Sequence, residues 1–239
     1  MKKFKDFRWH KSQRILKASR LGDVYKTLSN YFGPQDWWPG DSPFEVMVGA
    51  ILTQNTAWTN VEKAIKNLKQ ERVLTPRGLD SISVERLAAL IQPAGYFNVK
   101  AKRLKYFIHF LFREYGGNIR RMRKETGLKL HQKLLAVNGI GPETADSILL
   151  YALEKPFFVI DAYTKRIFSR HRLTVQTQSS PKRLSLSQDY KVWQSAFENS
   201  LPRRLGLFND FHAQIVAVGK NFCKPHNPLC HDCPLQKYF

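Results

Sequence analysis

A single carboxylate at the end of a wholly apolar run is the clearest chemical feature of the sequence. Asp161 directly follows the apolar residues 157–160 and precedes Ala162-Tyr163-Thr164, where a helix can begin. A carboxylate at such a boundary can stabilise an oxocarbenium-like sugar cation or orient an attacking water, provided that a flipped nucleotide faces it. An aspartate before a helix is also an ordinary N-cap, and the two roles are compatible. Asp161 is therefore a candidate catalytic residue, a helix cap, or both.

A glycine-containing turn between two apolar segments is the second feature. Gly139 and Gly141 interrupt the apolar periodicity, and Pro142 stands where a new helix would open. Glycine permits a positive φ, and the N–H groups at a helix start can face a phosphate oxygen. A tight turn that binds nothing is the alternative. Four residues are expected to contact a nucleic-acid backbone: Gly139, Ile140, Gly141 and Thr144.

The charge balance indicates the partner. The 239 residues include 39 Lys and Arg against 19 Asp and Glu, a net charge of +20. Such a field attracts nucleic acid, although a solubilising surface or a position near the ribosome are other readings. The positively charged N-terminus is not followed by the apolar run of a signal peptide, and no apolar segment is long enough to span a membrane. We expect a monomeric cytoplasmic, nucleoid-associated protein with no membrane partner.

Hydrophobic periodicity predicts a helical fold. Apolar residues recur at helical spacing after Asp41-Ser42-Pro43, and again over residues 84–91, 99–112 and 128–135. Alternating runs with hairpin turn signals are scarce, and the break at 178–181 is expected to be a short loop. The expected fold class is all-α.

Together these features resemble the endonuclease III superfamily of helix-hairpin-helix DNA glycosylases. The resemblance covers most of the chain, in the segments Pro43-Phe44-Glu45, Leu52-Thr53-Gln54-Asn55-Thr56, 137–145, Val159-Ile160-Asp161 and Cys223-x6-Cys230-x2-Cys233. It implies the catalytic role for Asp161, and two helical lobes with a DNA-binding cleft between them. Residues 43–155, with the helix-hairpin-helix at about 128–153, would form one lobe. Residues 1–42 and 156–239, with a C-terminal cysteine loop, would form the other.

The hairpin also bears on the reaction that the resemblance implies. Bifunctional members of the superfamily carry a lysine just before the Thr-Ala of the hairpin helix, and its amine attacks the sugar. This chain has Glu143 there. A carboxylate forms no imine, so we expect base excision without lyase activity, with water as the nucleophile. Approach of another lysine to the sugar is the remaining route to strand cleavage.

Aromatic segments at 37–39, 54–58 and 92–104 resemble the 3-methyladenine DNA glycosylase branch. This implies duplex DNA with an alkylated base, whose positive charge aromatic rings can hold by stacking and cation–π attraction. The alternative readings are that the tryptophans pack in the core, that Gln54 is a solvent-facing loop residue, and that Lys220 is a surface lysine that binds phosphate. Five residues are expected at the substrate: Trp38, Pro39 and Trp58 lining the base pocket, Gln54 filling the gap left by the flipped base, and Lys220 near the pocket.

The cysteines match the superfamily's iron–sulfur loop incompletely. The chain has the first three ligands at the expected spacing, Cys223, Cys230 and Cys233, but Phe239 stands at the fourth position. A [4Fe–4S] cluster usually requires four thiolates. The cluster would therefore recruit His226 or His231, leave one iron open, or be absent from a loop that retains only its scaffold.

Two alternatives to excision of an alkylated base remain. One is endonuclease III-like removal of oxidised pyrimidines or of mismatched adenine. The other is a helix-hairpin-helix DNA-binding protein without catalysis, in which Asp161 is only a cap.

Overall fold

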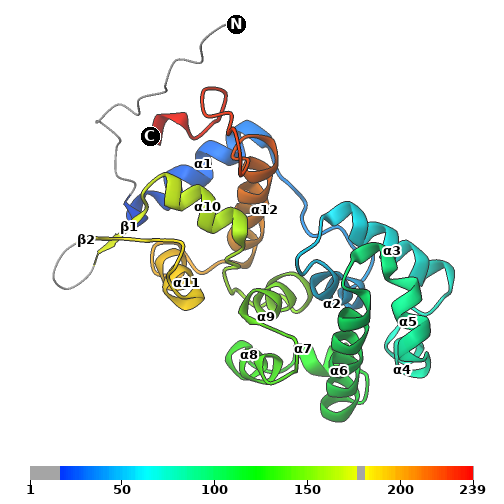
Figure 1. Ribbon diagram of the computed structural model, residues 1–239. Coiled ribbons are helices and arrows are strands. Elements are labelled where there is room, and N and C mark those ends of the chain that lie inside the picture. Colours follow the sequence, from blue (N-terminus) through cyan, green and yellow to red (C-terminus); the bar gives the residue numbers. More distant parts are fainter. Residues whose placement is uncertain (1–16, 177–180, 239) are drawn as a thin grey trace, which may run out of the picture. The chain divides into compact units, whose positions relative to one another are not determined.

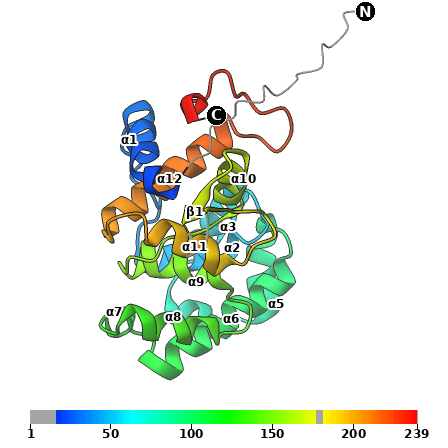
Figure 2. The same ribbon diagram turned by 90° about the vertical axis from the view of Figure 1, so that its left-hand side faces the viewer.

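The computed structural model describes residues 17–176 and 181–238, and their regular structure is almost entirely helical (Figures 1 and 2). This confirms the all-α class. The exception is an antiparallel pair of short strands, β1 (Thr174–Gln176) and β2 (Pro181–Arg183), in which Thr174 lies opposite Arg183. The sequence predicted only a loop at 178–181, because strands of three residues are too short to show an alternating pattern. Within the described ranges, no helix is both long enough and apolar enough to cross a membrane.

The chain divides into two compact units. The first contains the residues up to Gln35, Ile160–Pro202 and the residues from Phe211 onward, and the second contains Asp36–Val159 and Arg203–Asp210. The helices of the second unit are α2 (Pro43–Leu52), α3 (Trp58–Gln70), α4 (Pro76–Ser81), α5 (Val84–Leu90), α6 (Phe97–Tyr115), α7 (Ile119–Arg123), α8 (Gly127–Leu135) and α9 (Pro142–Ser147), which continues as a π-helix (Ile148–Ala152).

Helix α2 is the central element of the second unit. All of its residues after Pro43 are buried, and it contacts α3, α6, α9 and the π-helix. Ser42 caps it, since the Ser42 hydroxyl accepts a hydrogen bond from the Glu45 N–H at 3.2 Å. The core around α2 therefore positions the segments that follow its C-terminal end.

A buried lysine holds that end. The Nζ atom of Lys100 donates hydrogen bonds to the carbonyl oxygens of Leu52 and Ala94, both at 2.8 Å. Burial, with a smaller contribution from Arg103, lowers the pKa of Lys100 to about 8. Lys100 thus satisfies a carbonyl at the C-terminal end of α2 and joins it to the start of α6.

The first unit surrounds a smaller aromatic core. Its elements are α1 (Leu21–Phe32), α10 (Ala162–Arg170), β1, β2, α11 (Tyr190–Glu198) and α12 (Leu205–Asn221), whose first turns belong to the second unit. The ring of Phe168 lies edge-on to that of Phe197 at a centroid distance of 5.0 Å, and Phe197 contacts Phe211 at 6.1 Å. These contacts join α10, α11 and α12.

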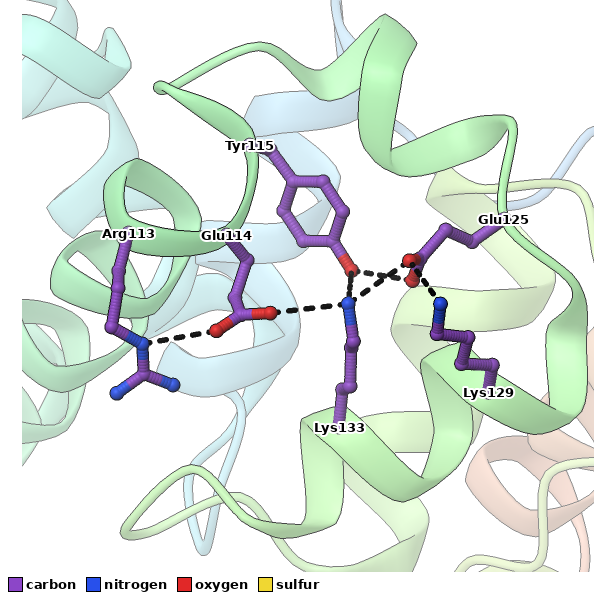
Figure 3. A network of polar contacts seen from close by, with 6 residues as sticks. All are labelled: Arg113, Glu114, Tyr115, Glu125, Lys129 and Lys133. Carbon is purple, nitrogen blue, oxygen red and sulfur yellow. Dashed lines mark hydrogen bonds and ion pairs between the residues drawn. The ribbon is translucent and has the colours of Figure 1, made fainter.

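An ion network joins α6 to α8 in the second unit (Figure 3). The Lys133 ammonium lies 2.9 Å from Glu125, 3.1 Å from Glu114 and 3.3 Å from the Tyr115 hydroxyl. That hydroxyl donates to Glu125 at 2.7 Å. Burial alone would raise the pKa of Glu125, but the hydrogen bonds from Tyr115, Lys133 and Lys129 lower it to about 2. The network therefore depends on an ionised Glu125.

Replacement of Glu125 by Gln should destabilise the protein only where the carboxylate is ionised. The folded pKa of about 2 lies below an unfolded value of ~4.3, so the stabilisation is full above ~4.3 and is lost as pH falls toward 2. At pH 7, Glu125→Gln should lower the thermal midpoint by ~2–4 °C, the shift expected for ~1 kcal/mol in a chain of this size. Thermal unfolding followed by circular dichroism at pH 7 and near pH 2 measures this. Glu85→Gln, at an exposed position on α5, is the control. If the thermal midpoints of the variant and the wild type differ by the same amount at pH 7 and near pH 2, the role given to Glu125 is wrong.

Candidate active site and nucleic-acid interface

Asp161 is the N-cap of α10, where the apolar run ends. Its Oδ1 atom accepts hydrogen bonds from the Thr164 N–H and from the Thr164 hydroxyl, each at 2.7 Å. Ile160 and Asp161 are both buried, and the Ile160 N–H donates to the Tyr190 hydroxyl at 3.1 Å. The cap fixes the carboxylate at the helix start, where the helix dipole favours a negative charge.

The second oxygen of Asp161 faces a histidine that the sequence analysis missed. Oδ2 lies 3.6 Å from Nε2 of His212, a buried residue of α12. Burial raises the pKa of the Asp161 carboxyl, but His212 and the hydrogen bonds from Thr164 more than offset this, so the pKa lies below its usual value. Asp161 is therefore negatively charged at neutral pH. His212 lies 51 residues away in sequence on an apolar helix face, which gives no pattern that could reveal the pair.

Helix α12 also carries Lys220, which is exposed. Lys220 follows His212 by eight residues, a distance of ~12 Å along a helix. The neighbouring Gly219 packs against the ring of Tyr163, because a Cβ atom at Gly219 would lie 2.1 Å from Cδ1 of Tyr163. The guanidinium of Arg166 lies over the same ring at 4.9 Å and donates to the Gly219 carbonyl at 3.3 Å. These contacts hold α10 against the end of α12 that bears Lys220.

The expected hairpin lies between α8 and α9 of the second unit. Gly139 has a φ of +85°, which requires glycine, whereas Gly141 has a φ of −92° and is exposed. The side chain of Ile140 is buried, and its N–H already donates to the Val137 carbonyl at 3.0 Å. The turn therefore depends on Gly139 for its conformation, and Gly141 lies at its surface.

Gln54 and Arg103 brace this hairpin. The Gln54 side-chain amide donates to the Gly139 carbonyl at 3.0 Å and to the Thr144 hydroxyl at 2.9 Å, and its oxygen accepts from the Arg103 guanidinium. The sequence predicts that Gln54 fills the gap left by a flipped base, and this role stays a prediction beside the contacts with the hairpin. Sequence reasoning missed Arg103, whose contact with Gln54 spans 49 residues.

The aromatic residues expected at the base pocket form a cluster. The rings of Trp38 and Trp58 meet edge-to-face, with centroids 5.2 Å apart at 88°, and Trp38 also contacts Tyr151 at 5.2 Å. A base stacked between two rings needs two contacts of ~3.5–4.0 Å each, and hence a separation of at least ~7 Å. Trp38 and Trp58 therefore do not enclose a base between them in this arrangement. Trp58 and Pro39 instead line an open cavity of about 380 Å³, within the ~300–1,000 Å³ typical of small-molecule sites.

The three cysteines lie near one another in the first unit. Burial raises the pKa of the Cys233 thiol to about 11 and also raises the pKa of Cys230. The Arg170 guanidinium donates to Sγ of Cys223 at 3.2 Å. In residues 17–176 and 181–238, no three His, Cys, Asp or Glu side chains are placed to hold a metal ion. Phe239, which stands where the pattern has its fourth cysteine, is outside the described residues. The described side chains therefore supply three of the four thiolates that a [4Fe–4S] cluster usually requires.

Comparison with known families identifies the class of protein. Residues 48–191 match the HhH-GPD superfamily of base excision DNA repair proteins, and the chain belongs to that family. This confirms the superfamily that the sequence motifs predicted.

Three relatives support the assignment. A Methanocaldococcus jannaschii protein that carries the provisional name of a DNA repair glycosylase is 45% identical over 93% of this chain and 96% of its own length. Endonuclease III of Thermotoga maritima is 30% identical over 82% of each chain. A thymine/uracil-DNA glycosylase of Pyrobaculum aerophilum is 29% identical over 85% of this chain and 83% of its own.

Solved structures show the same fold. The 3-methyladenine DNA glycosylase of H. pylori, bound to 1,N6-ethenoadenine, has a TM-score of 0.70 and 27% identity over 86% of this chain and 98% of that chain. An endonuclease III in a non-covalent complex with DNA has a TM-score of 0.76, with 18% identity over 94% of this chain and 95% of that chain. The chain is thus a base excision DNA glycosylase by family and by fold.

Replacement of Asp161 by Asn separates the structural role of this residue from its chemical role. Asn is as good an N-cap as Asp, so Asp161→Asn should keep the cap and lose only the stabilisation that His212 gives to the ionised carboxylate. Loss of the negative charge should reduce base excision by ~10²-fold or more, as expected for a group that stabilises a charged transition state. Single-turnover excision and thermal unfolding measure the two effects. Asp161→Ala is the companion variant, which should also lose ~1 kcal/mol of stability with the cap. Full excision by Asp161→Asn would exclude a catalytic role.

The hairpin offers a matched pair of glycines. Gly139→Ala should destabilise the protein by ~1–2 kcal/mol, because alanine is strained at positive φ and its Cβ would lie 2.3 Å from Cγ of Arg103. Gly141→Ala should change stability by less than ~0.5 kcal/mol, since nothing lies within 4 Å of a Cβ there. Denaturant unfolding of both variants tests this, and equal losses would show that the hairpin does not depend on the backbone conformation of Gly139.

Proposed function

We propose that the protein is a monofunctional DNA glycosylase that hydrolyses the N-glycosidic bond of an alkylated, positively charged base such as 3-methyladenine. The observation that carries the proposal is the ionised Asp161 at the start of α10. Its negative charge can stabilise the oxocarbenium-like sugar that forms as the base departs. If the protein only bound DNA, Asp161 would serve solely as the cap of α10.

The contacts of the lysines support water as the nucleophile. Glu143 occupies the exposed first turn of α9, where an imine-forming enzyme of this family needs a lysine. Lys100 and Lys105 both have lowered pKa values, as an amine nucleophile requires. However, Lys100 is only 1% exposed, and both ammonium groups donate to backbone carbonyls. Neither amine is therefore available to attack a sugar as a nucleophile.

The charge of an alkylated base suits a site with one carboxylate. A base that is methylated on a ring nitrogen is a good leaving group, so excision needs little help from a general acid. Trp58 and Pro39 at the open cavity can stack on such a base, and Trp38 supports the ring of Trp58. The H. pylori relative, which binds 1,N6-ethenoadenine, is consistent with a purine substrate.

Double-stranded DNA is the proposed partner. The net charge of +20 favours contact with phosphates, and we assign such contacts to the exposed Gly141 of the hairpin and to Lys220. The other expected hairpin residues, Gly139, Ile140 and Thr144, would support this turn, because the Ile140 N–H donates to a backbone carbonyl and Thr144 is buried. We interpret the two compact units as the two lobes of the family, and the protein as a monomer acting on the nucleoid DNA of the cytoplasm.

A second candidate function is removal of a thymine, uracil or oxidised pyrimidine. The identity of 29–30% to a thymine/uracil-DNA glycosylase and to endonuclease III favours it. These bases are neutral and are poorer leaving groups than an alkylated purine, so they would require more from the site than stacking and one carboxylate.

Release of damaged bases from defined duplexes distinguishes these functions. Duplexes containing 3-methyladenine, 7-methylguanine, thymine glycol or a G·T mismatch are incubated with the protein, and the products are analysed before and after alkali. We expect release of methylated base and an abasic strand that breaks only in alkali. Trp58→Ala should weaken engagement of the base by ~1–3 kcal/mol.

Each opposite result has a definite meaning. Strand cleavage without alkali, together with borohydride trapping of a protein–DNA adduct, would show that a lysine attacks the sugar. Release of pyrimidines but not of methylated purines would establish the second candidate function. DNA binding without release of any base would leave a non-catalytic binding protein.

A further inference from the structure

The indole of Trp58 is held by a carboxylate one helical turn further along α3. Nε1 of Trp58 donates a hydrogen bond to Oε1 of Glu62 at 2.7 Å. A hydrogen bond to an ionised acceptor is stronger than one between neutral groups, and here it opposes rotation of the indole about its side-chain torsions. Glu62 therefore fixes the plane of the aromatic ring at this cavity.

The charged groups that line the cavity are mostly acidic. Three carboxylates and two ammonium groups line it, so the lining has a net charge of −1 in a chain whose net charge is +20. The Lys69 ammonium forms ion pairs with Asp41 and with Glu45, each at 2.7 Å. Glu62 contacts the Trp58 indole, and Lys66 lies one turn further along the same helix. The charged lining residues are Asp41, Glu45, Glu62, Lys66 and Lys69.

We infer that Glu62 determines the preference of this cavity for a positively charged purine over a neutral one. A cationic base stacked on Trp58 gains cation–π attraction from the ring and Coulomb attraction from the adjacent carboxylate. Donation of the indole N–H to that carboxylate also increases the electron density of the ring. A neutral base gains only the stacking. This inference rests on the proposed function, since it assigns the cavity to the excised base.

Two substitutions at Glu62 separate its charge from its hydrogen bond. Glu62→Gln retains an oxygen acceptor for the Trp58 indole but removes the negative charge. It should lower kcat/KM for 7-methylguanine, which is cationic in DNA, by about 5- to 20-fold, and change kcat/KM for neutral 1,N6-ethenoadenine by less than about twofold. Glu62→Ala removes both interactions and should lower kcat/KM for both bases. Glu85→Gln, exposed on α5 and not part of the cavity, controls for the change in total charge.

A binding measurement on the full chain tests the same inference without requiring activity. The indole N–H signal of Trp58 is followed by NMR with ¹⁵N-labelled tryptophan, is assigned by its loss in Trp58→Phe, and is titrated with 7-methylguanosine and with guanosine. We expect the signal to move with the cationic nucleoside at a concentration at least fivefold lower than with guanosine, and this difference to disappear in Glu62→Gln.

The outcomes keep this inference distinct from the proposed function. If the wild-type protein releases no methylated base but binds 7-methylguanosine in this way, the proposed function fails and the cavity assignment stands. If the Trp58 signal responds to neither nucleoside, or if Glu62→Gln affects charged and neutral bases equally, the role given to Glu62 is wrong.

Discussion

The two hydrogen bonds from Thr164 to one oxygen of Asp161 are the constraint on which the candidate active site depends. They make α10 the element that orients the carboxylate, because an N-cap side chain must point back at the first turn of its helix. The other oxygen is then directed toward His212. Since the apolar residues before Asp161 are buried, the carboxylate is fixed from both sides, and it remains ionised despite its burial because the groups around it favour the charged form.

In the second unit, polar side chains also fix the position of a turn. They connect the hairpin to the buried core around α2. Lys100 binds the carbonyl at the end of α2, and Gln54 follows two residues after that end. Gln54 and Arg103 in turn hold the hairpin at Gly139. A continuous set of contacts thus joins the buried helix to the turn that is proposed to bind phosphate. Preorganisation of this kind lowers the conformational entropy that binding would otherwise cost.

The sequence predicted those features that arise from short-range patterns. The helical class follows from periodicity, the cap at Asp161 from its place before a helix, and the turn from Gly139. The contacts made by His212 and Arg103 join residues about 50 positions apart, and no spacing rule reveals them. Glu62 is only four residues from Trp58, but a Glu at that spacing on a helix is ordinarily a solvated charge, so its contact with the indole becomes visible only with the side-chain rotamers. Strands β1 and β2 are too short to produce a period.

The packing of Gly219 against Tyr163 has a consequence for variation within the family. Even alanine at position 219 would bring a carbon within 2.1 Å of the tyrosine ring, so a larger residue can be accommodated only if the side chain at position 163 becomes smaller or α12 moves away from α10. Such a movement would displace His212 and Lys220, which lie on the same helix. Positions 163 and 219 should therefore covary among homologues, and a lineage that loses one member of the pair without changing the other should show altered geometry around the carboxylate, even though neither residue touches it.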